Sequence, residues 1–259
     1  MFMRAIVRIP GDNFSEGLTS VGQGQAGPPV YDKALQQHEA YREALEACGL
    51  RLTVLGKDLD YPDSTFVEDT AVLTRNAAIF TRPGAASRGG EVERIRPAVL
   101  GWFRKHYEIT APGTLDGGDI CEAGSHFFIG ISRRTNEEGA RQLKGFLARE
   151  GCTSSCVDIR RMTSILHLKS GIACIDDHTL VLLDELADRP EFQGYRTIRV
   201  PEGESYAANC VRVNDRVLLA SGFPGLEASL KANGFAPLVL DMSEYRKMDG
   251  GLSCLSLRF

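Results

Sequence analysis

Long apolar runs are missing from this sequence of 259 residues. No uncharged apolar stretch approaches the roughly 18 residues that a membrane span requires. The first ten residues also hold too short an apolar run for a signal peptide. We therefore expect a cytoplasmic protein that has no membrane partner.

Cysteine is scarce and scattered. The seven cysteines are an odd number, none forms a C-x-x-C pair, and the closest two are Cys152 and Cys156. Disulfide frameworks and structural zinc sites need cysteines in pairs or at regular ligand spacing. Both are therefore disfavoured, and no metal is expected.

An excess of positive charge is also absent. Lys and Arg number 30 against 34 Asp and Glu, which gives a formal net charge of -4, and no basic patch stands out. A nucleic-acid partner is therefore disfavoured, whereas a cationic small molecule is allowed. Hydrophobic residues at 43% and charged residues at 25% are typical of a globular protein with a sizeable core.

What the sequence does contain is a repeated architectural pattern. Four segments read as β-hairpins, in which two apolar runs flank a short polar turn. They are Ala71–Thr81, Ile120–Ile131, Ile172–Leu183 and Val211–Ala220. After each hairpin come a stretch with helical apolar spacing and one further short apolar run. The expected helices are Glu91–Lys105, Ala140–Arg149, Asp184–Phe192 (cut by Pro190) and Gly225–Asn233, and the expected strands are Tyr107–Thr110, Cys156–Ile159, Thr197–Val200 and Leu238–Leu240.

The two chain ends supply a fifth copy. Ser253–Leu257 and Ala5–Ile9 would form its hairpin, and Asp32–Cys48 and Leu50–Leu55 its helix and last strand. Repeats of about 20–50 residues usually build solenoids, propellers or arrays, and a copy shared by both termini closes a ring. We predict an α/β fold, a five-bladed α/β propeller of ββαβ units forming a single domain over residues 1–259. The pattern alone leaves an irregular α+β sheet open.

Residues 11–29 do not follow the repeat. They contain five glycines, end in Pro28-Pro29 and show no periodicity. Loops of this length without structure of their own are usually functional or disordered. We predict a mobile lid, with a plain disordered loop as the alternative.

Polar side chains gather in the loops that lead into the first strand of each unit. Equivalent positions in a ring of repeats converge near its axis, so we expect these side chains at one end of the central channel. They comprise carboxylates from two units, a histidine from the third and cysteines from the last two. The residues are Asp63, Glu68, Asp69, Asp116, Asp119, His167, Cys210 and Cys254.

Each of these residues also has a purely structural interpretation. The carboxylates of the first unit could pair with an internal arginine, and those of the second could serve a tight Gly-Gly turn. A lone histidine or a buried cysteine is usually structural. Nothing local separates Cys254 from Cys210.

As a group, the residues suit the hydrolysis of a guanidinium compound. Carboxylates hold guanidinium N–H groups in charge-assisted pairs. A thiolate is strong enough to attack the central carbon, and a histidine can protonate the leaving amine and then activate water. Clustered carboxylates should raise the pKa of the thiol and an arriving cation should lower it. We therefore hypothesise that the substrate itself stabilises the thiolate.

Two arginines occupy matching places in two units. Ser87-Arg88-x-x-Glu91 recurs as Arg133-Arg134-x-x-Glu137, after a strand and before a helix. Because arginine near a helix N-terminus is unfavourable to the helix dipole, we interpret Arg88 and Arg134 as a clamp for the carboxylate of an amino-acid substrate. Two solvated arginines are the alternative.

These motifs resemble the dimethylarginine dimethylaminohydrolase family of the pentein, or guanidino-group-modifying, superfamily. The likeness runs from Glu16-Gly-Leu-Thr19 to the end of the chain. Its most specific pieces are Pro62-Asp-Ser-Thr-Phe-Val-Glu-Asp69, Thr114-Leu-Asp-Gly-Gly-Asp119, Arg134-Thr-Asn136, Leu166-His-Leu-Lys169, Ala207-Ala-Asn-Cys210 and Asp249-Gly-Gly-Leu-Ser-Cys254. Several such motifs in order are far more specific than any one alone.

The resemblance implies a propeller enzyme that hydrolyses asymmetric dimethylarginine, and monomethylarginine, to citrulline and the methylated amine without a cofactor. It implies Cys254 as the nucleophile of a covalent thiouronium intermediate, His167 as the proton donor and Asp116 as the acidic partner. Some relatives have Glu at this last place, one methylene longer. The implied substrate-binding residues include Glu68 and Asp69, of which Asp69 lies directly at the guanidinium. The resemblance also implies Arg88 and Arg134 at the α-carboxylate, and Asp63 with the backbones of Leu18 and Met248 at the α-amino group.

Three other functions stay open at this stage. An arginine deiminase would use the same chemistry on unmethylated arginine, but such enzymes are usually longer, with an inserted helical region that is absent here. A non-enzymatic propeller binding protein would lack the cysteine and histidine. A metal-binding module would show ligand spacing. The sequence leaves the oligomeric state open and is compatible with a homodimer.

Overall fold

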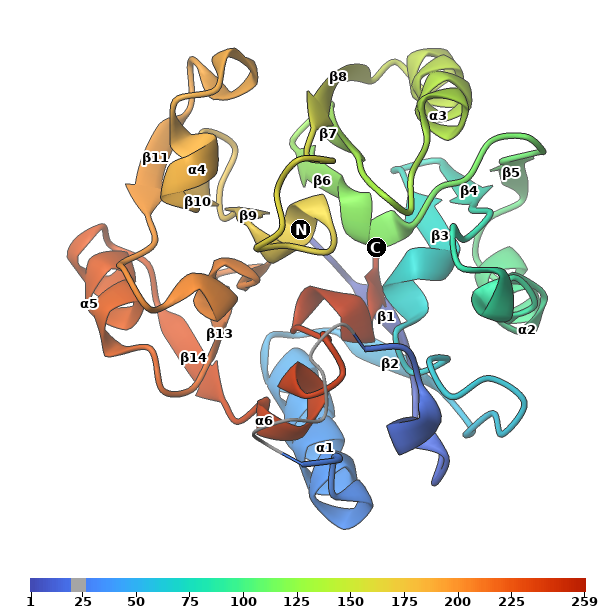
Figure 1. Cartoon of the computed structure of the whole chain (residues 1–259), viewed down its shortest axis with the longest axis horizontal. Coiled ribbons are helices and arrows are strands. Elements are labelled where there is room, and N and C mark those ends of the chain that lie inside the picture. The colour runs from blue at the N-terminus through green and yellow to red at the C-terminus, as the bar shows by residue number, and fades with distance from the viewer. Residues whose placement is uncertain (20–26) are drawn as a thin grey trace.

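Five three-stranded sheets stand around a common centre in the computed structural model, which describes residues 1–19 and 27–259 (Figure 1). In each sheet an antiparallel hairpin is followed by a third strand parallel to the hairpin's second strand. The longer helices lie outside the ring of sheets (Figure 1). They are α1 (Tyr31–Ala47), α2 (Glu91–Leu100), α3 (Glu137–Arg149) and α5 (Pro224–Ala232). The five-bladed α/β propeller predicted from the repeat is confirmed.

The strands follow the predicted units closely. The sheets are β3–β4–β5 (Ala71–Leu73, Ala77–Phe80, Lys105–Glu108), β6–β7–β8 (Ile120–Ala123, His126–Ile131, Thr153–Asp158), β9–β10–β11 (Ile172–Cys174, Thr179–Leu182, Arg196–Arg199), β12–β13–β14 (Val211–Val213, Arg216–Ala220, Pro237–Leu240) and β15–β1–β2 (Leu257–Arg258, Arg4–Arg8, Arg51–Leu55).

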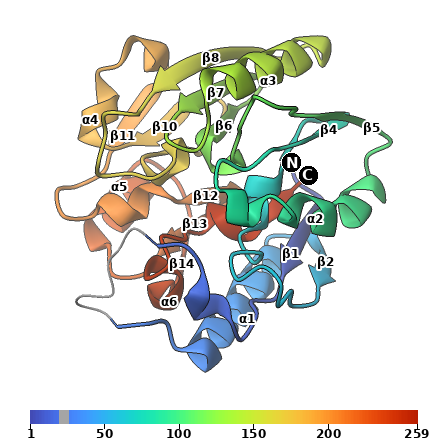
Figure 2. The same cartoon turned by 45° about the vertical axis from the view of Figure 1, so that its right-hand side comes forward.

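The last of these sheets closes the ring with both ends of the chain. Strand β1 pairs antiparallel with β15 and parallel with β2. The N–H of Met3 donates to the carbonyl of Phe259 at 2.8 Å. The two termini lie near the ring centre in Figure 1, and they are close together in both views (Figures 1 and 2).

Some predicted boundaries are wrong, each for a local reason. Helix α2 ends at Leu100, because β5 takes the residues from Lys105 onward into parallel pairing with β4. Trp102 lies beyond the helix, 45% exposed, with the guanidinium of Arg4 over its ring. The stretch 184–192 divides at Pro190, which has no N–H for a helix, into α4 (Asp184–Ala187) and the 3-10 helix η6 (Pro190–Phe192).

The predicted strand 253–257 is also wrong over most of its length. Ser253–Leu255 forms a 3-10 helix, η8, and only the two residues of β15 pair with β1. A short helix that the sequence pattern did not indicate, α6 (Ser243–Arg246), precedes this segment.

A single-turn 3-10 helix leads into the first strand of every unit. These are η2 (Val67–Thr70), η4 (Gly117–Asp119), η5 (Leu168–Ser170), η7 (Ser205–Ala208) and η8. Helix η2 packs against η8 and η4, η4 packs against η5, and η5 packs against η7. The five turns therefore surround the axis at one end of the sheets, which brings the predicted polar loops together.

The predicted lid begins with an anchored segment. Phe14, in the 3-10 helix η1 (Phe14–Glu16), is buried between the rings of Phe66 and Tyr245. Residues 20–26 of the lid lie outside the described residues, and its mobility stays a prediction. Among the described residues, no helix is long and apolar enough to cross a membrane.

Candidate active site

The five 3-10 turns η2, η4, η5, η7 and η8 around the axis are called the inner turns below. Asp69 lies in η2, which packs against η8 and η4. Its Oδ1 accepts a hydrogen bond from the N–H of Gly118 at 2.8 Å, and its Oδ2 accepts one from Arg88 Nη1 at 2.5 Å. Burial raises the pKa of this carboxyl, but the charges of Arg88 and His167 and these two hydrogen bonds outweigh burial and lower it to about 2. Asp69 is therefore a carboxylate at neutral pH.

His167 lies directly before η5 and contacts a second buried carboxylate. Its Nε2 is 2.9 Å from Oδ2 of Asp116, whose other oxygen accepts the N–H of Gly84 at 2.8 Å. The shorter aspartate side chain therefore reaches the imidazole. Burial lowers the pKa of His167. The charges of Asp69, Asp119 and Asp116 and the hydrogen bond to Asp116 outweigh burial and raise the pKa to about 9. The imidazole is protonated at neutral pH, as a proton donor requires.

Asp119 supports the loop that carries this histidine. Its Oδ1 accepts the N–H of Leu168 at 3.0 Å, and its Oδ2 accepts the hydroxyl of Ser132 at 2.6 Å. The side chain is fully buried, and burial raises its pKa to about 6. Asp119 thus fixes the main chain directly after His167.

Cys254, in η8, is the half-buried cysteine of the inner turns. Burial raises the pKa of its thiol to about 12, and the charges of Glu68 and Asp69 add to the effect. The ligand atoms of Asp69 and His167 lie within 4.8 Å of each other, and η2, which contains Asp69, packs against η8, which contains Cys254. Cys210, the other candidate, is buried in the apolar core.

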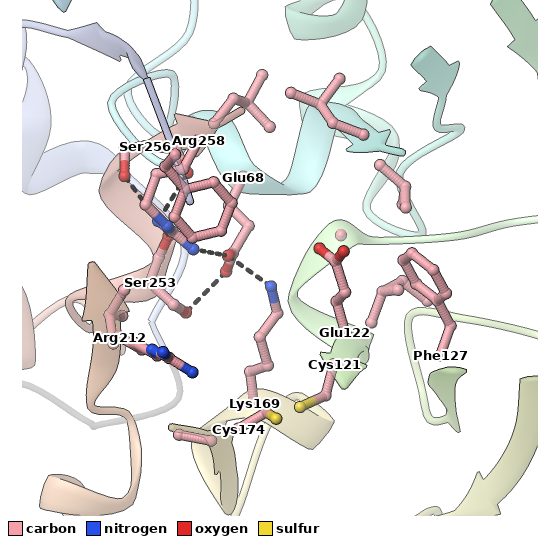
Figure 3. A pocket seen from close by; sticks show the side chains of 18 of the residues that line it. Glu68, Cys121, Glu122, Phe127, Lys169, Cys174, Arg212, Ser253, Ser256 and Arg258 are labelled. Carbon is pink, nitrogen blue, oxygen red and sulfur yellow. Dashed lines mark hydrogen bonds and ion pairs between the residues drawn. The ribbon is translucent and has the colours of Figure 1, made fainter. Parts of the chain in front are cut away.

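Glu68 lies on the same 3-10 turn as Asp69 but has different partners. Its carboxylate contacts Lys169 Nζ at 2.5 Å, the hydroxyl of Ser253 at 2.7 Å and Arg258 Nη2 at 3.5 Å (Figure 3). These groups border a cavity of about 670 Å³ that extends to the hairpin turns of the sheets. The role of Glu68 in substrate binding stays a prediction, and in this structure its carboxylate is engaged by protein cations.

The residues expected to hold an α-amino group lie together. Asp63 accepts the N–H of Leu18 at 3.1 Å and is only 6% exposed. A Cβ added to Gly17 would fall 2.5 Å from Asp63 Oδ1 and 3.3 Å from Met248 Cε, so these three segments approach closely. Burial raises the pKa of Asp63, although Arg88, the N–H of Leu18 and Arg134 act in the opposite direction.

The two arginines differ in their surroundings. Arg88 is 5% exposed rather than solvated, and its guanidinium donates to Glu91 and Asp69 and to two main-chain carbonyls. Arg134 is half-buried, and its main-chain N–H is held by Ser132 Oγ. Both charges lower the pKa of Asp63, and Arg88 Nη2 also donates to the main-chain carbonyl of Asp63 at 3.4 Å. The clamp for a substrate carboxylate stays a prediction. A substrate carboxylate would meet Arg134 more freely than Arg88.

Asp69, Asp116 and His167 also lie close enough to hold a metal ion, with ligand atoms all within 4.8 Å of one another. A histidine must be deprotonated to ligate a metal, whereas His167 has its pKa raised to about 9. An organic cation with N–H donors suits the two carboxylates without that change.

Comparisons with known proteins agree with this geometry. The chain is 46% identical over the full length of both chains to the dimethylarginine dimethylaminohydrolase of Pseudomonas aeruginosa. The chain belongs to the dimethylarginine dimethylaminohydrolase family. It is also 35% identical to the protein of that name from Streptomyces coelicolor, over 98% of this chain and 96% of the relative.

A solved structure of the Pseudomonas aeruginosa family member supports the same assignment. That structure, of a cysteine-to-serine variant in complex with citrulline, has a TM-score of 0.95 with 45% identity and covers 100% of both chains. A search against protein-family models found no match. The fold predicted from the repeat is therefore the fold of the dimethylarginine dimethylaminohydrolase family.

Sequence reasoning missed the polar side chains that surround Glu68. Lys169, Ser253 and Arg258 surround Glu68, and Asn209 joins two of these segments. Their position next to the candidate residues could have identified three of them, since Lys169, Ser253 and Asn209 lie inside the motifs already noted.

Proposed function

We propose that this chain hydrolyses asymmetric dimethylarginine, and monomethylarginine, to citrulline and the methylated amine. The observation that carries the proposal is the approach of residues from four units of the ring. The ligand atoms of Asp69, Asp116 and His167 lie within 4.8 Å of one another, and η2, which contains Asp69, packs against η8, which contains Cys254. Membership of a family whose relatives carry this activity in their name supports it.

Binding begins with the acidic centre. Asp69 and Asp116 accept N–H groups of the substrate guanidinium, and Arg134 and Arg88 attract its α-carboxylate. Asp63 and the backbones of Leu18 and Met248 receive the α-amino group. The cation brings positive charge next to the Cys254 sulfur, which lowers the thiol pKa. The thiol proton leaves to solvent, because His167 is already protonated.

Two chemical steps follow. The thiolate attacks the guanidinium carbon, and His167 gives its proton to the departing dimethylamine, which leaves a thiouronium adduct on Cys254. The now neutral His167 takes a proton from water as the water oxygen attacks the same carbon. Collapse of this intermediate breaks the C–S bond and releases citrulline and the free enzyme.

Alkylation of Cys254 should report the effect of the cation on the thiol. In the free protein the thiol pKa of about 12 predicts that alkylation by iodoacetamide rises with pH throughout the range up to about 10. Millimolar methylguanidinium should shift this profile to lower pH, because the cation offsets the charges of Glu68 and Asp69. The measurement is the rate of Cys254 labelling by peptide mass spectrometry. Identical profiles with and without the ligand would show that the cation does not stabilise the thiolate.

Substrate choice separates this proposal from an arginine deiminase. We expect citrulline from dimethylarginine, with kcat/KM at least roughly tenfold higher than with arginine, in steady-state assays of the purified protein. A reversed ratio would assign the arginine deiminase activity instead. Turnover that survives a chelator would exclude a required metal ion. A homodimer and a cytoplasmic location remain predictions from the sequence.

A further inference from the structure

The fourth unit contributes an amide to the ring of inner turns. Asn209 follows η7 and is 8% exposed. Its Nδ2 donates to the carbonyl of Lys169 at 2.9 Å and to the hydroxyl of Ser253 at 3.0 Å, and its Oδ1 accepts the N–H of Ser253 at 2.9 Å. Both amide atoms are therefore bonded to neighbouring units.

The partners of this amide stand next to the proposed catalytic groups. Lys169 is two residues after His167, and Ser253 immediately precedes Cys254. The hydroxyl of Ser253 donates in turn to Glu68, which precedes Asp69 (Figure 3). Asn209 thus links the loop of His167 to that of Cys254 and, through Ser253, to the turn that contains Asp69.

The fit around Asn209 is close. A Cβ added to Gly251 would fall 2.4 Å from Asn209 Oδ1, so the Gly251 backbone touches the amide. The site needs two donors and one acceptor on a short, planar group. Asparagine supplies all three, whereas aspartate lacks the donors.

We propose that Asn209 is a positioning residue, which fixes the Cys254 sulfur relative to the imidazole of His167 without touching the substrate. The inference rests on the proposed function. A displacement of about 1 Å between reacting groups can cost roughly 10²-fold in rate. Loss of the amide should therefore lower kcat and leave substrate binding in place, since the hydrogen bonds of the amide go to Lys169 and Ser253 and not to the proposed substrate-binding side chains.

The test is Asn209→Ala beside a matched control, Gln37→Ala. Gln37 is also a buried amide, which donates to Ser243 Oγ at 2.9 Å and accepts the N–H of Glu244 at 3.1 Å, outside the inner turns. We expect kcat for dimethylarginine to fall about 30- to 100-fold in Asn209→Ala, with KM within about threefold. Gln37→Ala should keep kcat within about twofold. Thermal melts must show both variants folded at the assay temperature.

Two further measurements separate positioning from general damage. The rate of Cys254 alkylation in Asn209→Ala should stay within about threefold of wild type, because a small reagent does not need the histidine. Ser253→Ala should lower kcat less than Asn209→Ala does, and the two effects should be non-additive in the double variant because they share a contact. If Asn209→Ala fails to fold, Ser253→Ala tests the same link, with an expected loss of about tenfold in kcat at unchanged KM.

Several results would overturn the inference. They are an unchanged kcat in Asn209→Ala, an equal loss in the Gln37 control, a parallel loss of kcat and alkylation, and additive effects in the double variant. Wild-type protein that releases no citrulline from dimethylarginine or arginine would overturn the proposed function and this inference together. Active wild-type protein with an unaffected Asn209→Ala variant would overturn the inference alone.

Discussion

Cys254→Ser is expected to lower citrulline formation by roughly three orders of magnitude or more, as nucleophile removal generally does. The burial and the acidic neighbours that raise the thiol pKa to about 12 act in the same direction on a serine hydroxyl, whose ordinary pKa is far higher. A guanidinium ligand can lower the thiol pKa into a useful range, but it cannot do so for the hydroxyl. The measurement is kcat for citrulline release from dimethylarginine.

Cys210→Ala is the matched control for this variant. Cys210 holds the equivalent place in the fourth unit, but it lies 3% exposed in the apolar core. Its truncation should lower the free energy of unfolding by about 1 kcal/mol and keep kcat within about threefold. Near-wild-type turnover in Cys254→Ser would show that the nucleophile is another residue. A collapse of kcat in folded Cys210→Ala would exchange the two assignments.

His167→Gly should lower turnover of dimethylarginine by roughly 10²- to 10⁴-fold. Dimethylamine is a poor leaving group unless it is protonated, and the imidazole with its pKa of about 9 supplies that proton. An isothiourea analogue of the substrate, in which an S-methyl group replaces the dimethylamino group, loses methanethiolate without that help. The variant should therefore form the thiouronium adduct with this analogue and hydrolyse it slowly, because no base activates water.

Intact-protein mass spectrometry measures the mass of the adduct on the protein. An adduct should accumulate on His167→Gly and not on wild-type protein, and Cys254→Ser should form none. His106→Gly is the control, since His106 lies exposed on β5 away from the inner turns. Rapid release of citrulline from the His167→Gly adduct would assign the activation of water to another group.

Local sequence pattern indicated the repeated unit, but it left an irregular α+β sheet open and did not separate Cys254 from Cys210; the resemblance to a known family favoured one answer in each case. Pairs of apolar runs around polar turns indicated the hairpins. The recurrence of these pairs along the chain indicated the number of units, including the one that both termini share. Equivalent loops of a ring must meet at its axis. The sequence therefore predicts that Asp69, Asp116, His167 and Cys254 lie near one another, and the ligand atoms of the first three lie within 4.8 Å of one another in the structure.

The direction of each side chain was decided by the tertiary structure. Glu68 and Asp69 are neighbours on one 3-10 turn, yet one faces Ser253, 185 positions away, and the other faces Arg88 and Gly118. The orientation of a single turn depends on how it packs against the other turns. The spacing of apolar residues in the sequence does not predict that packing.

Sequence alone thus indicated five repeated units and predicted that their polar loops meet at one axis, because chain-local periodicity encodes repeats; the resemblance to a known family favoured Cys254 over Cys210. Tertiary structure decided which carboxylate is paired with protein cations, how far burial raises the pKa of Cys254, and that Asn209 ties two units together. Those properties depend on distances between segments that are remote in the chain, and only folding brings such segments within reach of a hydrogen bond.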